Sequence, residues 1–281
     1  MGSYNVIMTC RDSEKDIRSA ILSLINQSTK PKYLVIIDDG STDNTPLILR
    51  EFKSLNKEIH VITNPNLGYD ITRVVMNWNS ALELAKKLKL EYTDYHMIAS
   101  DDTVFEDKYA EKIIKCMDSD PLIAIASGKP DNSTITEPRG AGRFVRNSFF
   151  LSIHGNYPEK MGYESIILYT SLKNGFKNLI VDDARFSHTR RLGSNHHFYD
   201  WGASMRTLGY HPLFVLGRFI QCFLTGKPIG RKGSLQMLYY FLTYKPKEKG
   251  YHSKYDAEIR KAIRMRQKTR IKEIFRLKNT R

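Results

Sequence analysis

Apolar and polar positions alternate between two patterns through the first part of the chain. Short apolar runs rich in β-branched residues predict strands, and they lie at residues 4–9, 33–37, 59–63, 95–99 and 123–126. Between them, apolar residues recur at three- and four-residue spacing, which predicts helices that bury one face. Ile17, Ile21 and Leu24 define the first helix, and three more are predicted at 46–55, 71–90 and 107–117.

Strands that alternate with helices in this way are typical of an α/β fold, in which helices cover both faces of a mostly parallel sheet. The pattern continues with a predicted helix at 164–173 and extended segments at 178–181 and 184–187. Ligands of such sheets bind outside the carboxyl ends of the strands. Side chains that follow those ends are therefore the first candidates for a site.

Pairs of aspartates stand directly after two of the predicted strands. Asp38 and Asp39 end the second strand, and Asp101 and Asp102 follow the fourth. Adjacent carboxylates repel each other, but their oxygens suit a hard divalent cation that also binds a diphosphate. The alternative for each pair is structural, as part of a turn or a helix cap. Because both pairs lie at strand ends, we predict that they line one cleft.

Three further residues carry chemistry that such a cleft could use. Arg73 lies at the start of a helix, where a cation can meet a phosphate or hold a carboxylate. Glu164 opens a later helix, and His188 ends an extended run. Each also has a structural interpretation: a surface charge, an acid favoured by the helix dipole, and a hydrogen-bonded histidine, respectively.

Positive charge is concentrated at the C-terminal end. The whole chain carries +14, and residues 245–281 hold fourteen Lys or Arg against four Asp or Glu, a net of +10. Within this tail, one face of a predicted helix is apolar and the rest is mostly basic; the apolar residues are Ile259, Ile263, Ile271, Ile274 and Phe275. A basic amphipathic helix suits an anionic membrane surface. The alternative is that these residues pack on the protein itself.

The composition is that of an ordinary folded protein in a reducing compartment. With 281 residues, 41% of them hydrophobic and 26% charged, the chain is long enough for one large α/β domain with an appendage. Its three cysteines form no CxxC pair, which predicts neither a disulfide framework nor a zinc site. The N-terminus has no signal-peptide pattern. Segments 213–224 and 235–242 are nearly all apolar, but spanning a bilayer takes about 20 such residues.

Taken in order, the motifs are more specific than any one of them. They are Asp38-Asp39-Gly40-Ser41-Thr42-Asp43, Asn66-Leu67-Gly68 with Arg73, Ser100-Asp101-Asp102, Gly162-Tyr163-Glu164 and His188. This series resembles the family 2 glycosyltransferases of the GT-A fold, over roughly residues 4–190. The resemblance implies a GT-A (Rossmann-like) catalytic domain at 1–195. Residues 196–281 would then form a helical, aromatic and basic appendage that associates with a membrane or an acceptor.

The same resemblance implies roles for individual residues. The nucleotide-binding set it implies is Thr9, Cys10, Arg11, Asp39, Arg73 and Asp101. Asp101 and Asp102 match the metal-binding region that carries the donor diphosphate, and His188 matches a further metal or phosphate contact. Glu164 stands where the family places its catalytic base.

Two positions depart from the family pattern. Ala99 stands where the first acid of the metal-binding motif is usual, which leaves open whether Asp101 or Asp102 binds the metal directly. Ser165 follows Glu164 where an Asp is usual, so the base is Glu164 or another acid of the chain.

The implied function is metal-dependent, inverting sugar transfer from a nucleotide-sugar donor to a glycan or lipid-linked acceptor. A UDP-sugar is favoured, a GDP-sugar is the alternative, and the cofactor would be Mn²⁺ or Mg²⁺. The basic tail predicts a peripheral location at the cytoplasmic face of a membrane. One alternative is transfer to a polyprenyl phosphate, an acceptor that is already anionic and needs no base. Another is a non-catalytic, basic nucleic-acid-binding protein on the same scaffold. It ranks last, because the chain has no RNP-like, zinc-finger or basic-zipper pattern.

Overall fold

The computed structural model describes residues 1–131, 135, 137–138, 140–190 and 198–279, with side chains described as far as residue 271. The chain divides into two compact units. The first comprises Met1–Pro158 and Asn174–Thr189, and the second comprises Glu159–Lys173 and Arg190–Arg281. The domain boundary expected near residue 195 stays a prediction. The helix that carries Glu164 belongs to the second unit.

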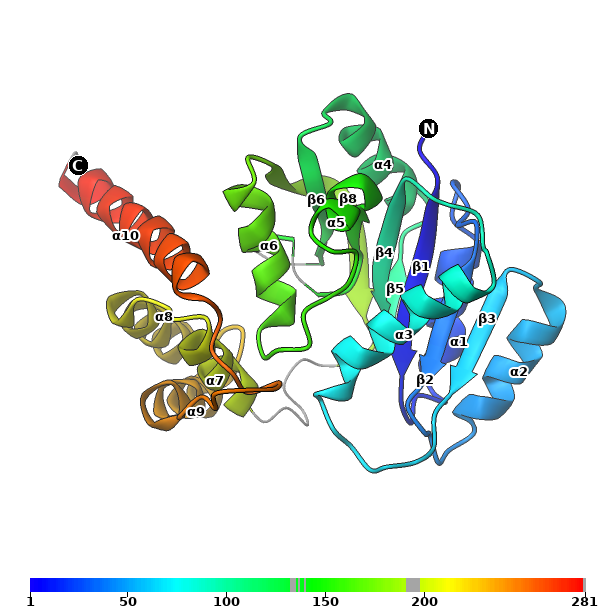
Figure 1. The fold of residues 1–281 in the computed structure, drawn as a ribbon, viewed down its shortest axis with the longest axis horizontal. Helices are drawn as coiled ribbons and strands as arrows, with labels where there is room; N and C mark the ends of the chain where they lie inside the picture. Colours follow the sequence, from blue (N-terminus) through cyan, green and yellow to red (C-terminus); the bar gives the residue numbers. More distant parts are fainter. Residues whose placement is uncertain (132–134, 136, 139, 191–197, 280–281) are drawn as a thin grey trace. The chain divides into compact units, whose positions relative to one another are not determined.

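An eight-stranded sheet forms the centre of the first unit (Figure 1). In sheet order its strands are β3 (Ile59–Thr63), β2 (Leu34–Asp38), β1 (Tyr4–Cys10), β4 (Tyr95–Ser100), β7 (Arg143–Arg146), β6 (Ile123–Pro130), β8 (Lys177–His188) and β5 (Thr103–Phe105). The strands β1 to β4 run parallel to one another, and β6 runs parallel to β8. β7 and β5 pair antiparallel with their neighbours. The predicted α/β class with a mostly parallel sheet is confirmed.

The register of the parallel strands brings the acidic strand ends to one edge of the sheet. Cys10 of β1 pairs with Asp38 of β2, and Thr9 pairs with Ser100 of β4, so the three strands end level. All five residues of β2 are buried, as expected for a parallel strand covered on both faces.

Helices cover both faces of the sheet, as the alternating pattern predicts. On one face, α1 (Ile17–Ile25), α2 (Thr45–Leu55) and α4 (Tyr109–Ser119) share a hydrophobic core with alternate strand residues such as Val6 and Met8. The helix α3 (Arg73–Lys87) crosses the other face, where it contacts β1 and β2 (Figure 1). A short helix, α5 (Asn147–Ser152), follows β7.

Three parts of the sheet differ from the sequence prediction, and one of them is β7, which was not among the predicted strands. The extended segments expected at 178–181 and 184–187 form one continuous strand, β8. The strand β5 was not predicted, because its three residues are too few to show a periodicity. It pairs antiparallel with the end of β8 and sets Thr103 opposite His188. This pairing positions the histidine.

The second unit is helical. It contains α6 (Tyr163–Lys173), α7 (Tyr199–Thr207), α8 (Pro212–Thr225), α9 (Gly230–Thr243) and α10 (Ala257–Asn279). Its helices share a hydrophobic core that includes Met237, Phe241 and Ile263. The helices α7 and α9 approach closely at Gly202, where an added Cβ would lie 2.3 Å from the carbonyl oxygen of Met237. The predicted helical C-terminal region is confirmed.

The tail helix α10 packs two of its predicted apolar residues on the protein. Ile263 is fully buried, and Ile259 packs against the same core. For these two residues the structure therefore shows the alternative to a membrane-facing role, which is packing on the protein itself. Ile274 and Phe275 lie outside the residues whose side chains are described. Across the described ranges, no helix combines the length and the apolar character that crossing a membrane requires.

Candidate active site

Asp39, at the end of β2, is held by two side chains of α3. The guanidinium of Arg73 donates two parallel hydrogen bonds, from Nε to Oδ1 at 3.0 Å and from the terminal nitrogen to Oδ2 at 2.8 Å. Asn77 lies one helical turn further on and donates to Oδ1 at 3.1 Å. Burial alone would raise the pKa of Asp39, but the hydrogen bonds from Arg73 and Asn77 lower it overall. Of the two roles open to Arg73, the structure shows the one in which it holds a carboxylate.

The neighbouring Asp38 closes a turn. Its Oδ1 accepts hydrogen bonds from the backbone N–H of Ser41 at 2.9 Å and from the Ser41 hydroxyl at 2.6 Å. Gly40 within this turn has a φ of +73°, a conformation that suits glycine. An added Cβ there would lie 2.6 Å from the Cα of Asn66. Asp38 therefore has a structural role in a turn, whereas Asp39 accepts hydrogen bonds from side chains of α3.

The loop after β1 lies beside this network. Arg11 donates to the backbone carbonyl of Asp39 and, at 2.8 Å, to the side-chain oxygen of Asn66. The hydroxyl of Thr9 accepts a hydrogen bond from the indole N–H of Trp78 at 3.1 Å. These contacts link the ends of β1 and β2 to α3 and to the loop after β3. The predicted residues Thr9, Arg11, Asp39 and Arg73 are thus brought together.

Cys10 contributes to this region through its backbone. Its side chain is buried, and the thiol lies 3.6 Å from the carbonyl oxygen of Ile37. Burial raises the pKa of the Cys10 thiol well above its ordinary value, and the nearby carboxylates of Asp101 and Asp38 add to the shift. The thiol is therefore neutral and inert, and a ligand would meet only the main chain at this position.

The second aspartate pair divides into a buried and a more exposed member. Asp101 is 8% exposed, and its Oδ2 accepts a hydrogen bond from the hydroxyl of Ser13. The side chain of Asp102 is 19% exposed, and its Oδ1 lies 3.4 Å from Nδ1 of His188. The hydroxyl of Thr103 lies 3.1 Å from the same nitrogen. The pairing of β5 with β8 therefore joins Asp102 and His188, which lie 86 residues apart in the sequence.

The described side chains offer few ligands to a divalent cation at this position. Among the residues that the structure describes, no three His, Cys, Asp or Glu side chains are grouped to hold a metal ion. Asp102 and His188 provide one oxygen and one nitrogen within 3.4 Å of each other. Two protein ligands fit a cation that takes its remaining ligands from substrate phosphates and water, as Mg²⁺ commonly does. The pair fits a metal shared with a bound diphosphate and does not fit a closed structural metal site.

Glu164 lies in the first turn of α6, in the second unit. It is partly buried and follows Gly162, whose φ of +88° places the turn before the helix in the left-handed region. The structure therefore gathers the predicted nucleotide and metal residues in the first unit and carries the predicted base on the second.

Three site residues were missed by sequence reasoning. Asn77 holds Asp39, Trp78 holds Thr9, and Ser13 binds Asp101. Asn77 could have been found, because it lies four residues after Arg73 and so on the same helical face. Ser13 and Trp78 gave no such signal, since their partners lie 88 and 69 residues away in the sequence.

Comparison with known proteins establishes the family. The chain matches the family model of glycosyl transferase family 2 over residues 5–182, more than half of its length. The protein belongs to glycosyl transferase family 2. The family membership predicted from the motif series is confirmed, and with it the general class of glycosyltransferase.

Curated relatives match over short regions. A poly-beta-1,6-N-acetyl-D-glucosamine synthase of Staphylococcus epidermidis is 24% identical over 124 residues, which cover 44% of this chain and 27% of that protein. An uncharacterized glycosyltransferase of Haemophilus influenzae is 39% identical over 66 residues, covering 23% of this chain and 20% of that protein. The chain therefore spans about a quarter of the length of the curated relatives it matches.

Two solved structures are similar in fold. Residues 1–349 of S. aureus TarS in complex with UDP-GlcNAc give a TM-score of 0.54 at 16% identity, with 85% of this chain and 71% of that chain covered. The mannosyltransferase PcManGT from Pyrobaculum calidifontis, in complex with GDP-Man and Mn²⁺, gives 0.56 at 13% identity, with 85% and 69% covered. At these identities the similarity establishes the fold, and the predicted GT-A fold class is confirmed.

Proposed function

We propose that the protein transfers a sugar from a nucleoside-diphosphate sugar to an acceptor, with inversion at the anomeric carbon. The observation that carries the proposal is the level ending of β1, β2 and β4, which sets the Asp39 network and the Asp102–His188 pair along one edge of the sheet. Ligands of open α/β sheets bind at this edge. The bound UDP-GlcNAc of TarS and GDP-Man of PcManGT support a nucleotide-sugar donor.

The nucleotide would be held at the ends of β1 and β2. Asp39 is fixed in its ionised form by Arg73 and Asn77, so it offers a rigid acceptor for N–H groups of a base. Thr9, Cys10 and Arg11 would lie beside the same nucleotide, Cys10 through its main chain. A UDP-sugar is the favoured donor, and a GDP-sugar is the alternative. Asp101, which is buried against Ser13, would orient the neighbouring ribose.

Asp102 and His188 would hold a divalent cation together with the donor diphosphate. Mn²⁺ fits this pair better than Mg²⁺, because Mg²⁺ prefers oxygen ligands throughout whereas an imidazole nitrogen suits transition metals. When bound, the cation offsets the negative charge that develops on the leaving diphosphate. The more exposed position of Asp102 supports it, over Asp101, as the direct ligand.

Glu164 would act as the general base. A sugar hydroxyl is a weak nucleophile until its proton is removed, and a carboxylate within hydrogen-bond reach can remove it. The deprotonated oxygen then attacks the anomeric carbon from the side opposite the leaving diphosphate. The C–O bond to the acceptor forms as the bond to the phosphate oxygen breaks, so a single displacement inverts the configuration.

The donor site is tested by a thermal-shift panel of nucleoside diphosphates, with and without Mn²⁺. A ligand that binds only the folded state at 100 times its dissociation constant adds about 2.7 kcal/mol of stability, which corresponds to a rise of several degrees in melting temperature. We expect UDP with Mn²⁺ to give the largest rise and uridine to give little. Absence of a rise with every nucleoside diphosphate, with or without metal, would contradict the proposal.

We also propose that the second unit meets an anionic membrane surface, which would bring a lipid-linked acceptor to the enzyme. The helix α8 is apolar on nearly every side, with Arg218 as its one charged residue. Leu213, Leu216, Ile220 and Leu224 recur every three or four residues on its outer face, and between 44% and 72% of each is exposed. A helix that is apolar all round is otherwise found in a protein core or a membrane.

The helix α9 lies beside α8 (Figure 1). It continues the pattern of exposed apolar residues. Leu235, Tyr239 and Leu242 lie on one face of it and are each more than half exposed. From Trp201 to Lys247 the chain has seven Lys or Arg and no Asp or Glu. An exposed apolar stripe with only positive charge around it fits an interface rich in anionic lipid. The apolar surface of this proposal belongs to α8 and α9, since Ile259 and Ile263 of α10 belong to the core of the second unit.

Co-sedimentation with vesicles tests this proposal. Replacing Leu213 and Leu224 together by Ser should lower binding to phosphatidylglycerol vesicles at least tenfold, because each side chain loses about 1–2 kcal/mol of apolar burial at the interface. Leu55→Ser removes an equally exposed leucine from α2 of the first unit and should leave binding unchanged. Raising the salt concentration should weaken binding of the unaltered protein. If the unaltered protein does not bind anionic vesicles at low salt, the membrane proposal is wrong. The predicted location at a cytoplasmic membrane face is then wrong as well.

A further inference from the structure

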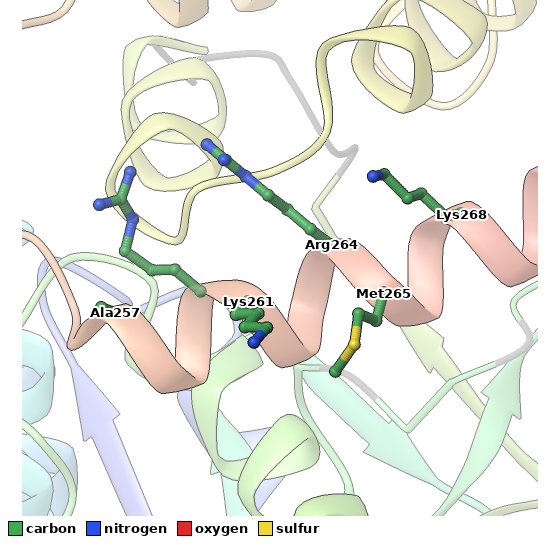
Figure 2. A pocket seen from close by; sticks show the side chains of 6 residues that line it. Ala257, Lys261, Arg264, Met265 and Lys268 are labelled. Carbon is green, nitrogen blue, oxygen red and sulfur yellow. The ribbon is translucent and has the colours of Figure 1, made fainter.

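Five cations from separate parts of the second unit line one cavity of about 370 Å³. They are Arg206 of α7, Lys245 and Lys254 of the segment between α9 and α10, and Arg260 and Arg264 of α10. Arg260 and Arg264 also line a neighbouring cavity of about 350 Å³ along α10, together with Lys261 and Lys268. Figure 2 shows Arg264 and Lys268 extending from the same side of α10. The two cavities form a continuous basic region of the second unit.

No described carboxylate balances the charges of the larger cavity. In the described part of the chain, no salt bridge joins any of the five cations of the larger cavity to a carboxylate. The Nε atom of Arg260 is buried, and no described atom accepts its hydrogen bond. Burial lowers the pKa of Arg260, and the like charges of Arg264 and Arg206 lower it further. An anion in the cavity would offset this repulsion between like charges.

The guanidinium groups are held in place by the fold. Arg264 donates from Nε to the carbonyl oxygen of Gly209 at 2.7 Å. Arg206 lies over the ring of Phe241, with 5.7 Å from its central carbon to the ring centroid. Gly209 has a φ of +72°, and a Cβ there would lie 2.6 Å from Nε of Arg260, so the glycine leaves room for that side chain. Arginines fixed in this way differ from mobile surface charges, because little of their side-chain entropy is left to lose on binding.

We propose that this cavity is a binding site for a phosphate or diphosphate group. Guanidinium forks match the geometry of phosphate oxygens, and several of them around one cavity favour a group with more than one negative charge. Every residue of the site belongs to the second unit, and the site does not depend on whether the chain transfers a sugar. The phosphate could be that of a soluble phosphate ester or that of a lipid headgroup.

Calorimetric titration of the full chain with sodium pyrophosphate tests the proposal. The titration is run in EDTA at constant ionic strength, so that metal-dependent binding and general charge screening do not contribute. We expect one pyrophosphate to bind, and we expect Arg260→Gln to weaken binding about tenfold or more, the effect of losing one charge-assisted pair of hydrogen bonds. Gly209→Ala should weaken binding as well, since its Cβ displaces the Arg260 guanidinium. Lys232→Gln, which removes an exposed charge of α9 outside the cavity, should have no effect.

Melting temperatures separate a binding role from a structural one. Because Arg260 is repelled by its neighbours, Arg260→Gln should melt no lower than the unaltered protein without pyrophosphate, and should lose the stabilisation that pyrophosphate gives. If Arg260→Gln does not fold, Arg206→Gln serves for the same titration. Three results would overturn the proposed site. The first is failure of the unaltered protein to bind pyrophosphate, and the second is a loss of pyrophosphate affinity in Lys232→Gln as large as that in Arg260→Gln. The third is pyrophosphate binding that persists in Arg260→Gln and vanishes in Asp102→Asn.

Vesicles containing phosphatidic acid, compared with pure phosphatidylcholine, identify the source of the phosphate. If the site takes a lipid headgroup, Arg260→Gln should reduce binding to phosphatidic acid vesicles while Lys232→Gln does not. If it takes a soluble phosphate ester, Arg260→Gln should lose pyrophosphate binding and keep vesicle binding. Both results support the phosphate site and differ only in what delivers the phosphate.

Discussion

Asp102→Asn should reduce sugar transfer by about 10³-fold while the protein stays folded. The substitution keeps the size of the side chain but removes the charge that would hold a divalent cation beside His188. A metal ion stabilises the developing charge of a leaving diphosphate by several kcal/mol, and each 1.36 kcal/mol corresponds to a factor of ten in rate. Release of nucleoside diphosphate from the donor, followed with and without Mn²⁺, measures the effect.

The single substitution at Asp102 is a cleaner test than replacing both aspartates. Asp101 is buried and bound by Ser13, so its replacement would also disturb the end of β4. Asp107→Asn is the matched control, because it makes the same change at an exposed aspartate shortly after the motif. Asp102→Asn should also lose the part of the UDP-induced thermal shift that depends on Mn²⁺ and keep the rest. Full activity of the unaltered protein in excess EDTA would contradict the metal proposal.

The fold of the first unit was predictable because its signal is local and repeated. The strands β1, β2 and β4 are short runs of residues buried on both faces, and the helices between them show apolar residues at helical spacing, so the alternation alone gives the class. What the sequence could not provide is pairing over long separations. The three residues of β5 have no pattern of their own, and they form a strand only because the end of β8 lies beside them.

The same distinction between local signals and long-range pairing applies to the residues of the candidate site. The acids at the ends of β2 and β4 were predictable, because a carboxylate directly after a buried strand is placed by that strand. Their partners were not, since Ser13 and Trp78 are ordinary residues of a loop and a helix until the fold brings them to Asp101 and Thr9. The tail shows a further limit of sequence reasoning. Ile259 and Ile263 of its predicted apolar face pack on the core of the second unit, but periodicity alone does not say whether such a face packs on the protein or on a membrane.

Glu164→Gln should lower turnover on a hydroxyl acceptor by about 10²–10⁴-fold, the usual contribution of a general base. Glutamine keeps the size of the side chain and a favourable helix propensity but cannot take up a proton. Binding of the donor should be unchanged, because Glu164 lies in α6 of the second unit and the proposed nucleotide residues lie in the first. Turnover is measured with saturating donor, and the thermal shift with UDP and Mn²⁺ is measured in parallel.

The control for Glu164→Gln is Glu111→Gln, which makes the same change in the first turn of α4. An acid in that position is favoured by the helix dipole, so any loss of turnover or stability common to both variants reflects the dipole and not catalysis.

The choice of acceptor gives a second readout. A phosphate acceptor is already anionic, so an enzyme for polyprenyl phosphate should tolerate Glu164→Gln far better than one for a sugar hydroxyl. Near-normal turnover on a hydroxyl acceptor would place the base elsewhere. Asp183 would then be the next residue to replace, because the carboxylate of its neighbour Asp182 is already paired with Lys129 at 2.5 Å.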